Sequence, residues 1–174
     1  LKLFIYGMYP AAQIWRVNVV YVLFFSQCAV LMVPRFPYKK CIGLFALTGF
    51  PLLSYYLLAG GFFGMAEVDT ELWSGLLLTL VIAFLAIEFS FPLGLLLALG
   101  RRSKMPIVKS FSVIYIELFR AVPLITILFM SSVMLPIFLT EGVHIDKLLR
   151  AIIGIVIFMS SYMAEAVRGG IQAI

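Results

Sequence analysis

The sequence predicts an all-α integral membrane protein, built as a polytopic bundle of transmembrane helices. Of its 174 residues, 64% are hydrophobic and only 12% are charged, and the mean hydropathy is +1.14. Soluble domains usually contain about 45–50% apolar and about 25% charged residues, so this composition requires lipid as the solvent. The apolar residues also form long uninterrupted runs, whereas the strands of a membrane β-barrel would alternate apolar and polar residues.

The charges between the apolar runs predict how the chain lies in the membrane. The formal net charge is +5, and most of the basic surplus falls in two short loops. The first loop contains Arg35, Lys39 and Lys40, and the second contains Arg101, Arg102, Lys104 and Lys109. Short loops rich in Lys and Arg face the cytoplasm. Because these residues lie between membrane spans, we attribute the basicity to membrane orientation and expect no nucleic-acid partner.

The N-terminal part of the chain predicts an interfacial segment followed by two accessory transmembrane helices within residues 17–63. Residues 1–16 mix aromatic and polar side chains, which is typical of a segment at the membrane surface, here the periplasmic one. Residues 17–33 and 41–63 are apolar runs within the range of about 17–25 residues that a spanning helix needs. The next loop carries only acidic charges, so we place it outside the cell.

The remaining apolar residues predict a third span over residues 76–99 and then a broken helix. The run from 107 to 139 would form about 50 Å of straight helix, which exceeds the hydrocarbon core of about 30 Å. We expect a break at Pro123, because proline interrupts helical hydrogen bonding. The part before Pro123 should run obliquely near the cytoplasmic face, and the part after it should cross outward. Residues 148–164 then return inward, and residues 165–174 are cytoplasmic.

Two charged motifs lie near the predicted cytoplasmic side. Glu117 and Arg120 are three residues apart, as are Glu165 and Arg168, so each pair shares one face of a helix. The simplest interpretation is a weak local ion pair in each motif. A charged pair beside a helix break can instead form a hinge or a docking surface. The residues expected to break the helices directly after the pairs are Pro123, Gly169 and Gly170.

Three motifs in order resemble the permease subunit of polar amino-acid ABC importers. The family's Gly-Leu-x-x-Thr-Leu run matches residues 75–80, and its Glu-Leu-Phe-Arg-x-x-Pro-Leu run matches residues 117–124. Its Ala-Glu-x-x-Arg-Gly-Gly-Ile-Gln-Ala run matches residues 164–173. Any one of these motifs would be a weak signal, but three in order are a strong one. Further likeness to the general L-amino-acid permease branch comes from residues 9–10, 15–16, 92–94 and 98–103.

The resemblance implies a type I ABC importer permease fold, of which this chain would be a truncated copy. Residues 72–174 would form the first half of the core domain and stop before the cytoplasmic coupling loop that docks on the ATPase. The chain begins with Leu1 and stops at Ile174 directly after a motif, so we expect it to be part of a longer protein. The protein would be a multi-pass component of the bacterial inner (plasma) membrane.

The resemblance also implies a function and its partners. The chain would line the translocation path of an amino-acid importer beside a second permease subunit, expected to be a related paralogue. A periplasmic amino-acid-binding protein would deliver the substrate, and a separate ABC ATPase subunit would hydrolyse ATP. No Gly-x-x-x-x-Gly-Lys-Ser/Thr run occurs in the sequence, so we do not expect the permease itself to be an enzyme. The candidate residues are Glu88, Glu117, Arg120 and Pro123 for translocation, and Glu165, Arg168, Gly169 and Gly170 for coupling at a helix end.

Glu88 lies about halfway along the third predicted span. A carboxylate at that depth costs at least about 2.5–3.5 kcal/mol on insertion scales, so it should face the bundle interior, a cation or a watery cavity. One hypothesis is that it meets the ammonium group or a side-chain charge of an amino acid in transit. The other is structural: an ion pair with a cation on another segment, or a protonated carboxyl bonded to a neighbouring helix.

Two other functional classes serve as alternatives. An intramembrane enzyme would need catalytic groups at membrane depth, but Asp69, Asp146 and the single histidine, His144, all lie in predicted loops. With no other imidazole or thiolate near His144, we expect no metal site and no cofactor. A fragment of a secondary transporter or channel, not driven by ATP, would show inverted repeats in its hydropathy.

Overall fold

The computed structural model describes residues 2–33, 38–61, 64–138 and 145–172. In these ranges the regular secondary structure is helical throughout, without a β-strand. A bent helix pair, Pro106–Ala121 with Leu124–Phe138, forms a fifth candidate span besides four single ones. The single segments long and apolar enough to cross a membrane are Ala11–Met32, Lys39–Ala59, Gly75–Arg101 and Lys147–Gln172. These helices confirm the predicted all-α, multi-spanning architecture.

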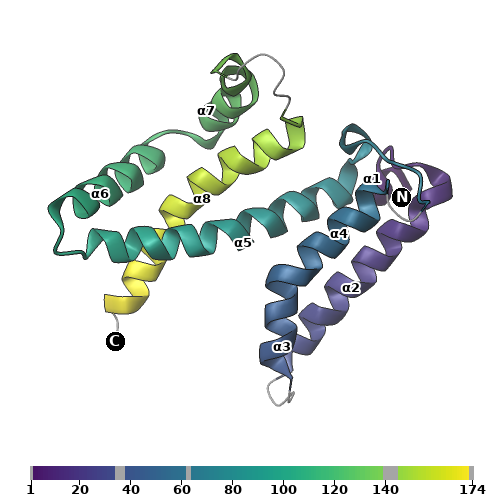
Figure 1. Cartoon of the computed structure of the whole chain (residues 1–174), viewed down its shortest axis with the longest axis horizontal. Helices are drawn as coiled ribbons and strands as arrows, with labels where there is room; N and C mark the ends of the chain where they lie inside the picture. Colours follow the sequence, from purple (N-terminus) through teal and green to yellow (C-terminus); the bar gives the residue numbers. More distant parts are fainter. Residues whose placement is uncertain (1, 34–37, 62–63, 139–144, 173–174) are drawn as a thin grey trace. The chain divides into compact units, whose positions relative to one another are not determined.

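Contacts divide the chain into two compact units, Leu1–Val81 and Ile82–Ile174. The boundary lies inside the third span rather than in the loop before it, so the packing units differ from the segments expected from the sequence. The functional division into residues 1–16, 17–63 and 72–174 therefore stays a prediction. Figure 1 shows the helices of both units.

The first unit begins with the short helix α1 (Lys2–Tyr6), the 3₁₀ turn η1 (Ala11–Gln13) and the first span, α2 (Ile14–Met32). This span starts at Ile14 rather than at the predicted residue 17, so it includes Arg16. Arg16 is only 3% exposed, and its Nη1 donates a hydrogen bond to the carbonyl of Ala66 at 2.9 Å. That backbone acceptor lets a guanidinium lie in the first turn of an apolar helix, where sequence alone favours an interfacial loop.

The second span consists of α3 (Lys39–Leu44), the π-helical turn η2 (Phe45–Gly49) and α4 (Phe50–Ala59). Pro51 has no backbone donor, and its ring crowds the carbonyl four residues earlier, so the wider turn before it accommodates the proline. The helix ends at Ala59 because Gly60 adopts a φ of 73°, which favours glycine. The predicted end at residue 63 lies outside the described residues.

The first unit is joined by contacts between its two spans. The aromatic rings of Phe24 on α2 and Phe50 on α4 have centroids 6.0 Å apart. The hydroxyl of Tyr9 donates a buried hydrogen bond to the carbonyl of Leu58 at 2.8 Å, which ties the N-terminal segment to the end of α4. The 3₁₀ turn η3 (Thr70–Leu72) lies in the acidic loop before the third span.

In the second unit, the third span α5 (Gly75–Arg101) and the helices α6 (Pro106–Ala121) and α8 (Lys147–Gln172) share a small apolar core. Each helix contributes one almost fully buried residue to it: Ala98, Ile116 and Ala164. The i, i+4 spacing of Gly94 and Ala98 predicts a close helix contact. This prediction is confirmed, since a Cβ on Gly94 would lie 2.6 Å from Met163 Cβ and 3.0 Å from the backbone nitrogen of Ala164.

The predicted break at Pro123 is confirmed. The axis turns by 102° between α6 and the following segment, which consists of α7 (Leu124–Phe129), the π-helical turn η4 (Met130–Met134) and the 3₁₀ turn η5 (Leu135–Phe138) (Figure 1). Val122 has extended φ and ψ of −96° and 136°. A proline sterically disfavours the helical conformation in the residue before it, so Pro123 accounts for the break locally.

The expected break at Gly169 and Gly170 is wrong. The helix α8 runs from Lys147 through both glycines to Gln172, beyond the predicted end at residue 164. Glycine inside a helix costs about 1 kcal/mol relative to alanine, but it keeps its backbone donor and adds no steric clash. Two glycines therefore weaken this helix end without interrupting it, whereas a proline interrupts.

Replacing Gly94 by alanine tests the close approach of α5 and α8. The new methyl group has no room beside Met163, so we expect the free energy of unfolding to fall by about 1–3 kcal/mol despite the better helix propensity of alanine. Gly170→Ala is the matched control, because no atom lies within 4 Å of its Cβ position. It should stabilise α8 by up to about 1 kcal/mol. Denaturant titration of both variants in mixed micelles measures the difference, and an equal effect of the two substitutions would contradict the packing.

Candidate functional site

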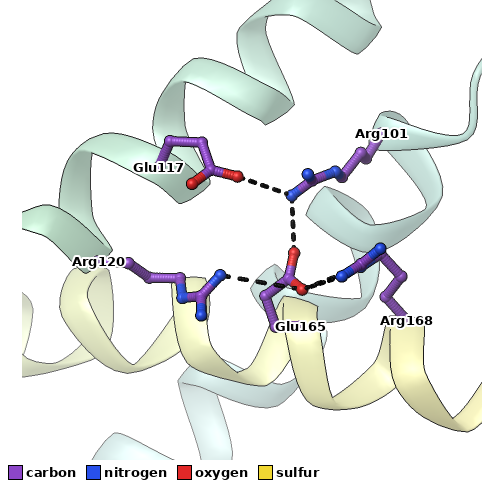
Figure 2. A network of polar contacts seen from close by, with 5 residues as sticks. All are labelled: Arg101, Glu117, Arg120, Glu165 and Arg168. Carbon is purple, nitrogen blue, oxygen red and sulfur yellow. Dashed lines mark hydrogen bonds and ion pairs between the residues drawn. The ribbon is translucent and has the colours of Figure 1, made fainter.

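Five charged side chains from three helices meet in the second unit. Arg101 ends α5, Glu117 and Arg120 lie in the last two turns of α6, and Glu165 and Arg168 lie near the C-terminal end of α8. In Figure 2 the carboxylate of Glu165 lies among the guanidinium groups of the three arginines. We call these five residues the Glu165 network.

Apolar packing next to the charges positions the Glu165 network. Ile116 and Ala164 are buried in the shared core, and each directly precedes an acid of the network in the sequence. On α5, Ala98 belongs to the same core, one turn before Arg101. Burying these three residues therefore brings the charged ends of the three helices together.

Glu165 makes the closest contacts. Its Oε1 accepts a hydrogen bond from Arg101 Nη1 at 2.7 Å, and its Oε2 accepts two from Arg168, from Nε at 2.9 Å and Nη2 at 2.6 Å. Arg120 Nη1 lies 3.9 Å from the same Oε2. The Glu165 side chain is 17% exposed, which limits competition from water. Charge-assisted bonds of this kind contribute about 1.5–3 kcal/mol each.

Glu117 occupies the outer edge of the network. It accepts one hydrogen bond, from Arg101 Nη1 at 3.2 Å, and its side chain is 57% exposed. An ion pair this exposed is worth about 0–1 kcal/mol. The guanidinium carbon of Arg120 lies 5.7 Å from the ring centroid of Tyr162, within range of a cation–π contact. With three guanidinium groups and two carboxylates, the network has a net charge of +1.

The structure corrects the prediction of two separate local ion pairs. Glu165 and Arg168 do pair within α8, as their spacing predicts. Among the described residues, however, no ion pair joins Glu117 to Arg120: Glu117 contacts α5 and Arg120 contacts α8. The two motifs thus form one site. Sequence reasoning treated Arg101 only as a loop charge, because a contact between residues 64 positions apart leaves no local pattern.

The three remaining motif residues flank the Glu165 network. Pro123 marks the bend that directly follows Arg120 on α6. Gly169 and Gly170 continue α8 beyond Arg168, and a Cβ on either glycine would have no neighbour within 4 Å. The described surroundings of both glycines are therefore open.

Glu88 lies on α5 apart from the Glu165 network, 13 residues and thus about 20 Å of helix before Arg101. Its Oε2 is buried and has no hydrogen-bond partner among the described residues. A buried carboxylate oxygen without a partner is costly in a membrane span. The position therefore needs a group that the described residues do not supply.

Possible metal ligands are sparse in the described part of the chain. No group of three or more His, Cys, Asp or Glu side chains lies close enough together there to hold a metal ion. His144, the single histidine, falls outside the described residues.

Neutralising Glu165 should destabilise the unit more than neutralising Glu117. Glu165→Gln preserves the side-chain shape but leaves three guanidinium groups without their shared carboxylate, so we expect a loss of about 1–3 kcal/mol in the free energy of unfolding. Glu117→Gln removes one exposed contact and should cost less than about 1 kcal/mol. Parallel unfolding titrations in mixed micelles measure both values. Equal losses would mean that Glu165 does not organise the site.

Comparison with known proteins places the chain. No protein-family model and no solved structure matches it. It is 50% identical over 172 residues to the inner membrane amino-acid ABC transporter permease protein YhdY of Escherichia coli (strain K12), covering 98% of this chain and 47% of the relative. It is 34% identical over 229 residues to the glutamate/glutamine/aspartate/asparagine transport system permease protein BztC of Rhodobacter capsulatus, covering 98% and 52%. The probable glutamine ABC transporter permease protein GlnP of Bacillus subtilis (strain 168) is 33% identical over 103 residues, covering 59% and 46%.

The similarity extends along nearly the whole chain in the first two relatives, so it includes both the N-terminal spans and the charged motifs. The chain spans about half the length of the curated relatives it matches. These matches confirm the resemblance inferred from the three motifs, and the apolar helices agree with them. The chain belongs to the permease family of amino-acid ABC transporters.

Proposed function

We propose that this chain is a membrane-spanning part of the permease subunit of an ATP-driven ABC importer for amino acids, and that it contributes to the translocation path. The observation that carries the proposal is 50% identity to an amino-acid ABC transporter permease over 98% of the chain. Two of the three relatives named above are described as ABC transporter permeases, which favours this function over a secondary transporter or channel.

The proposed function defines the surroundings of the chain. It lies in the bacterial inner (plasma) membrane as a multi-pass protein, with its basic loops toward the cytoplasm. Its proposed partners are a separate ABC ATPase subunit that hydrolyses ATP, a second and related permease subunit, and a periplasmic amino-acid-binding protein. The permease itself would catalyse no reaction.

The Glu165 network would serve coupling in this transporter. It joins the ends of α5, α6 and α8 through one half-buried carboxylate, so a displacement of one helix end displaces the other two. The open helix end at Gly169 and Gly170 adjoins the network, which makes it a suitable site for a motion to enter from a cytoplasmic partner. Pro123 would let α7 and the segment after it change angle while α6 stays attached to α8.

Glu88 would contact the substrate during passage. Its buried oxygen has no described partner, and the cost of a carboxylate at membrane depth falls when a cation approaches. The ammonium group of an amino acid is such a cation. A structural ion pair with another segment explains the same observation, and the two roles differ in what a Glu88→Gln variant does to transport.

Uptake of labelled amino acids into proteoliposomes tests the proposed function. The vesicles contain the assembled permease and ATPase subunits, with ATP inside and the binding protein outside. We expect uptake only when both ATP and the binding protein are present. Uptake driven by an ion gradient in the absence of ATP would show a secondary transporter and refute the proposal.

The same vesicles test Glu88. We expect Glu88→Gln to lower uptake while the ATPase activity persists, because the substrate loses a charge partner and the helix contacts remain. Glu67→Gln, which removes an exposed carboxylate from the outer loop, is the matched control and should transport normally. If Glu88→Gln carries every tested amino acid at the normal rate, Glu88 has a structural role only.

A further inference from the structure

The helix α6 presents an apolar stripe to its surroundings on the side away from its packing partners. Four residues spaced by four, three and four positions form this stripe, with side chains between 54% and 82% exposed. They are Ile107, Phe111, Ile114 and Leu118. Ser112 and Ile116, which point toward the core, are almost fully buried. At 16 residues, α6 is about 24 Å long, too short to cross a hydrocarbon core of about 30 Å by itself.

An unpaired basic cluster lies at the start of α6. Arg102, Lys104 and Lys109 are exposed, and none of them has a carboxylate partner among the described residues. Residues 101–121 contain five basic side chains and one acidic side chain, a net charge of +4. The one acid, Glu117, is already in contact with Arg101. The cluster therefore has an excess of positive charge that the described part of the chain does not neutralise.

Exposed apolar surface lies on both sides of the basic cluster along the chain. Before it, Leu96 and Leu99 at the end of α5 are 66% and 52% exposed. After it, the stripe of α6 begins with Ile107. Cations between two lipid-facing apolar surfaces lie where phospholipid headgroups meet the acyl chains. A membrane surface supplies both an anion for the cluster and an apolar cover for the stripe.

We propose that Arg102, Lys104 and Lys109 bind the phosphate groups of anionic phospholipids in the cytoplasmic leaflet, while the stripe of α6 lies against their acyl chains. Each basic residue near an anionic membrane surface gains electrostatic attraction, and the three contributions add. The bound lipids would neutralise the turn between α5 and α6, directly beside Arg101. The proposal does not depend on what the permease transports.

Native mass spectrometry of the intact protein in neutral detergent, titrated with phosphatidylglycerol or phosphatidylcholine, tests this site. We expect a clear preference for phosphatidylglycerol in the unmodified protein. The triple variant Arg102→Gln, Lys104→Gln, Lys109→Gln should lose affinity for phosphatidylglycerol by about 100-fold, with binding of phosphatidylcholine unchanged. The control Lys2→Gln, Lys147→Gln removes two exposed cations that lie outside the cluster and should change the affinity little.

Three further arms separate this proposal from other sources of binding. In the unmodified protein, phosphatidylglycerol binding should weaken as salt increases, which remains measurable if the triple variant does not fold. The headgroup alone, as glycerophosphoglycerol, should bind far more weakly than the lipid, because the stripe then has no acyl chain. Equal binding of the headgroup and the lipid, or unchanged lipid binding by the triple variant, would overturn the proposal. A triple variant that keeps the lipid but no longer co-purifies with the ATPase would show a protein-docking surface instead.

Discussion

The carboxylate of Glu165 accepts hydrogen bonds from Arg101 at the end of α5 and from Arg168 one turn further along α8, and Arg120 of α6 lies 3.9 Å away. The other contacts at this end of the second unit depend on it, because without it three guanidinium groups would repel one another. The side chain is shielded enough for these bonds to be strong and accessible enough for its charge to be tolerated. A single residue thus joins three helices that are far apart in the sequence.

Lipid supplies little driving force for apolar helices to associate, so close packing and polar contacts must do so. In the second unit, Gly94 allows the backbone of α8 to approach α5, and the small residues Ala98 and Ala164 extend that contact toward the Glu165 network. The helix α6 attaches at the same place through Ile116. Its opposite side is apolar and its beginning is basic, which suits a helix that contacts both protein and membrane surface.

Features with a local cause could be predicted from the sequence. The apolar runs predicted each span to within a few residues of one end, and Pro123 predicted the bend, because one proline acts on its neighbours whatever surrounds it. The spacing of Glu165 and Arg168 predicted their ion pair. Three motifs predicted the family without any structural information.

Features that depend on distant partners could not be predicted. Arg16 lies inside the first span because the carbonyl of Ala66 accepts its hydrogen bond, and hydropathy has no access to that contact. Glu117 and Arg120 have the spacing of a local pair, yet they contact Arg101 and Glu165, since the packing of α6 directs them to neighbouring helices. Glycine marks a weak helix position, but whether the helix continues depends on what crowds it, and nothing described crowds Gly169 or Gly170.

A double-mutant cycle between Arg101 and Glu165 is the most direct test of the account. It compares the free energies of unfolding of the unmodified protein, Arg101→Met, Glu165→Gln and the double variant in mixed micelles. If the 2.7 Å contact joins α5 to α8, the two substitutions should be non-additive by about 1 kcal/mol or more. Additivity within about 0.3–0.5 kcal/mol would mean that the helix ends do not depend on each other through Glu165, and would contradict the account.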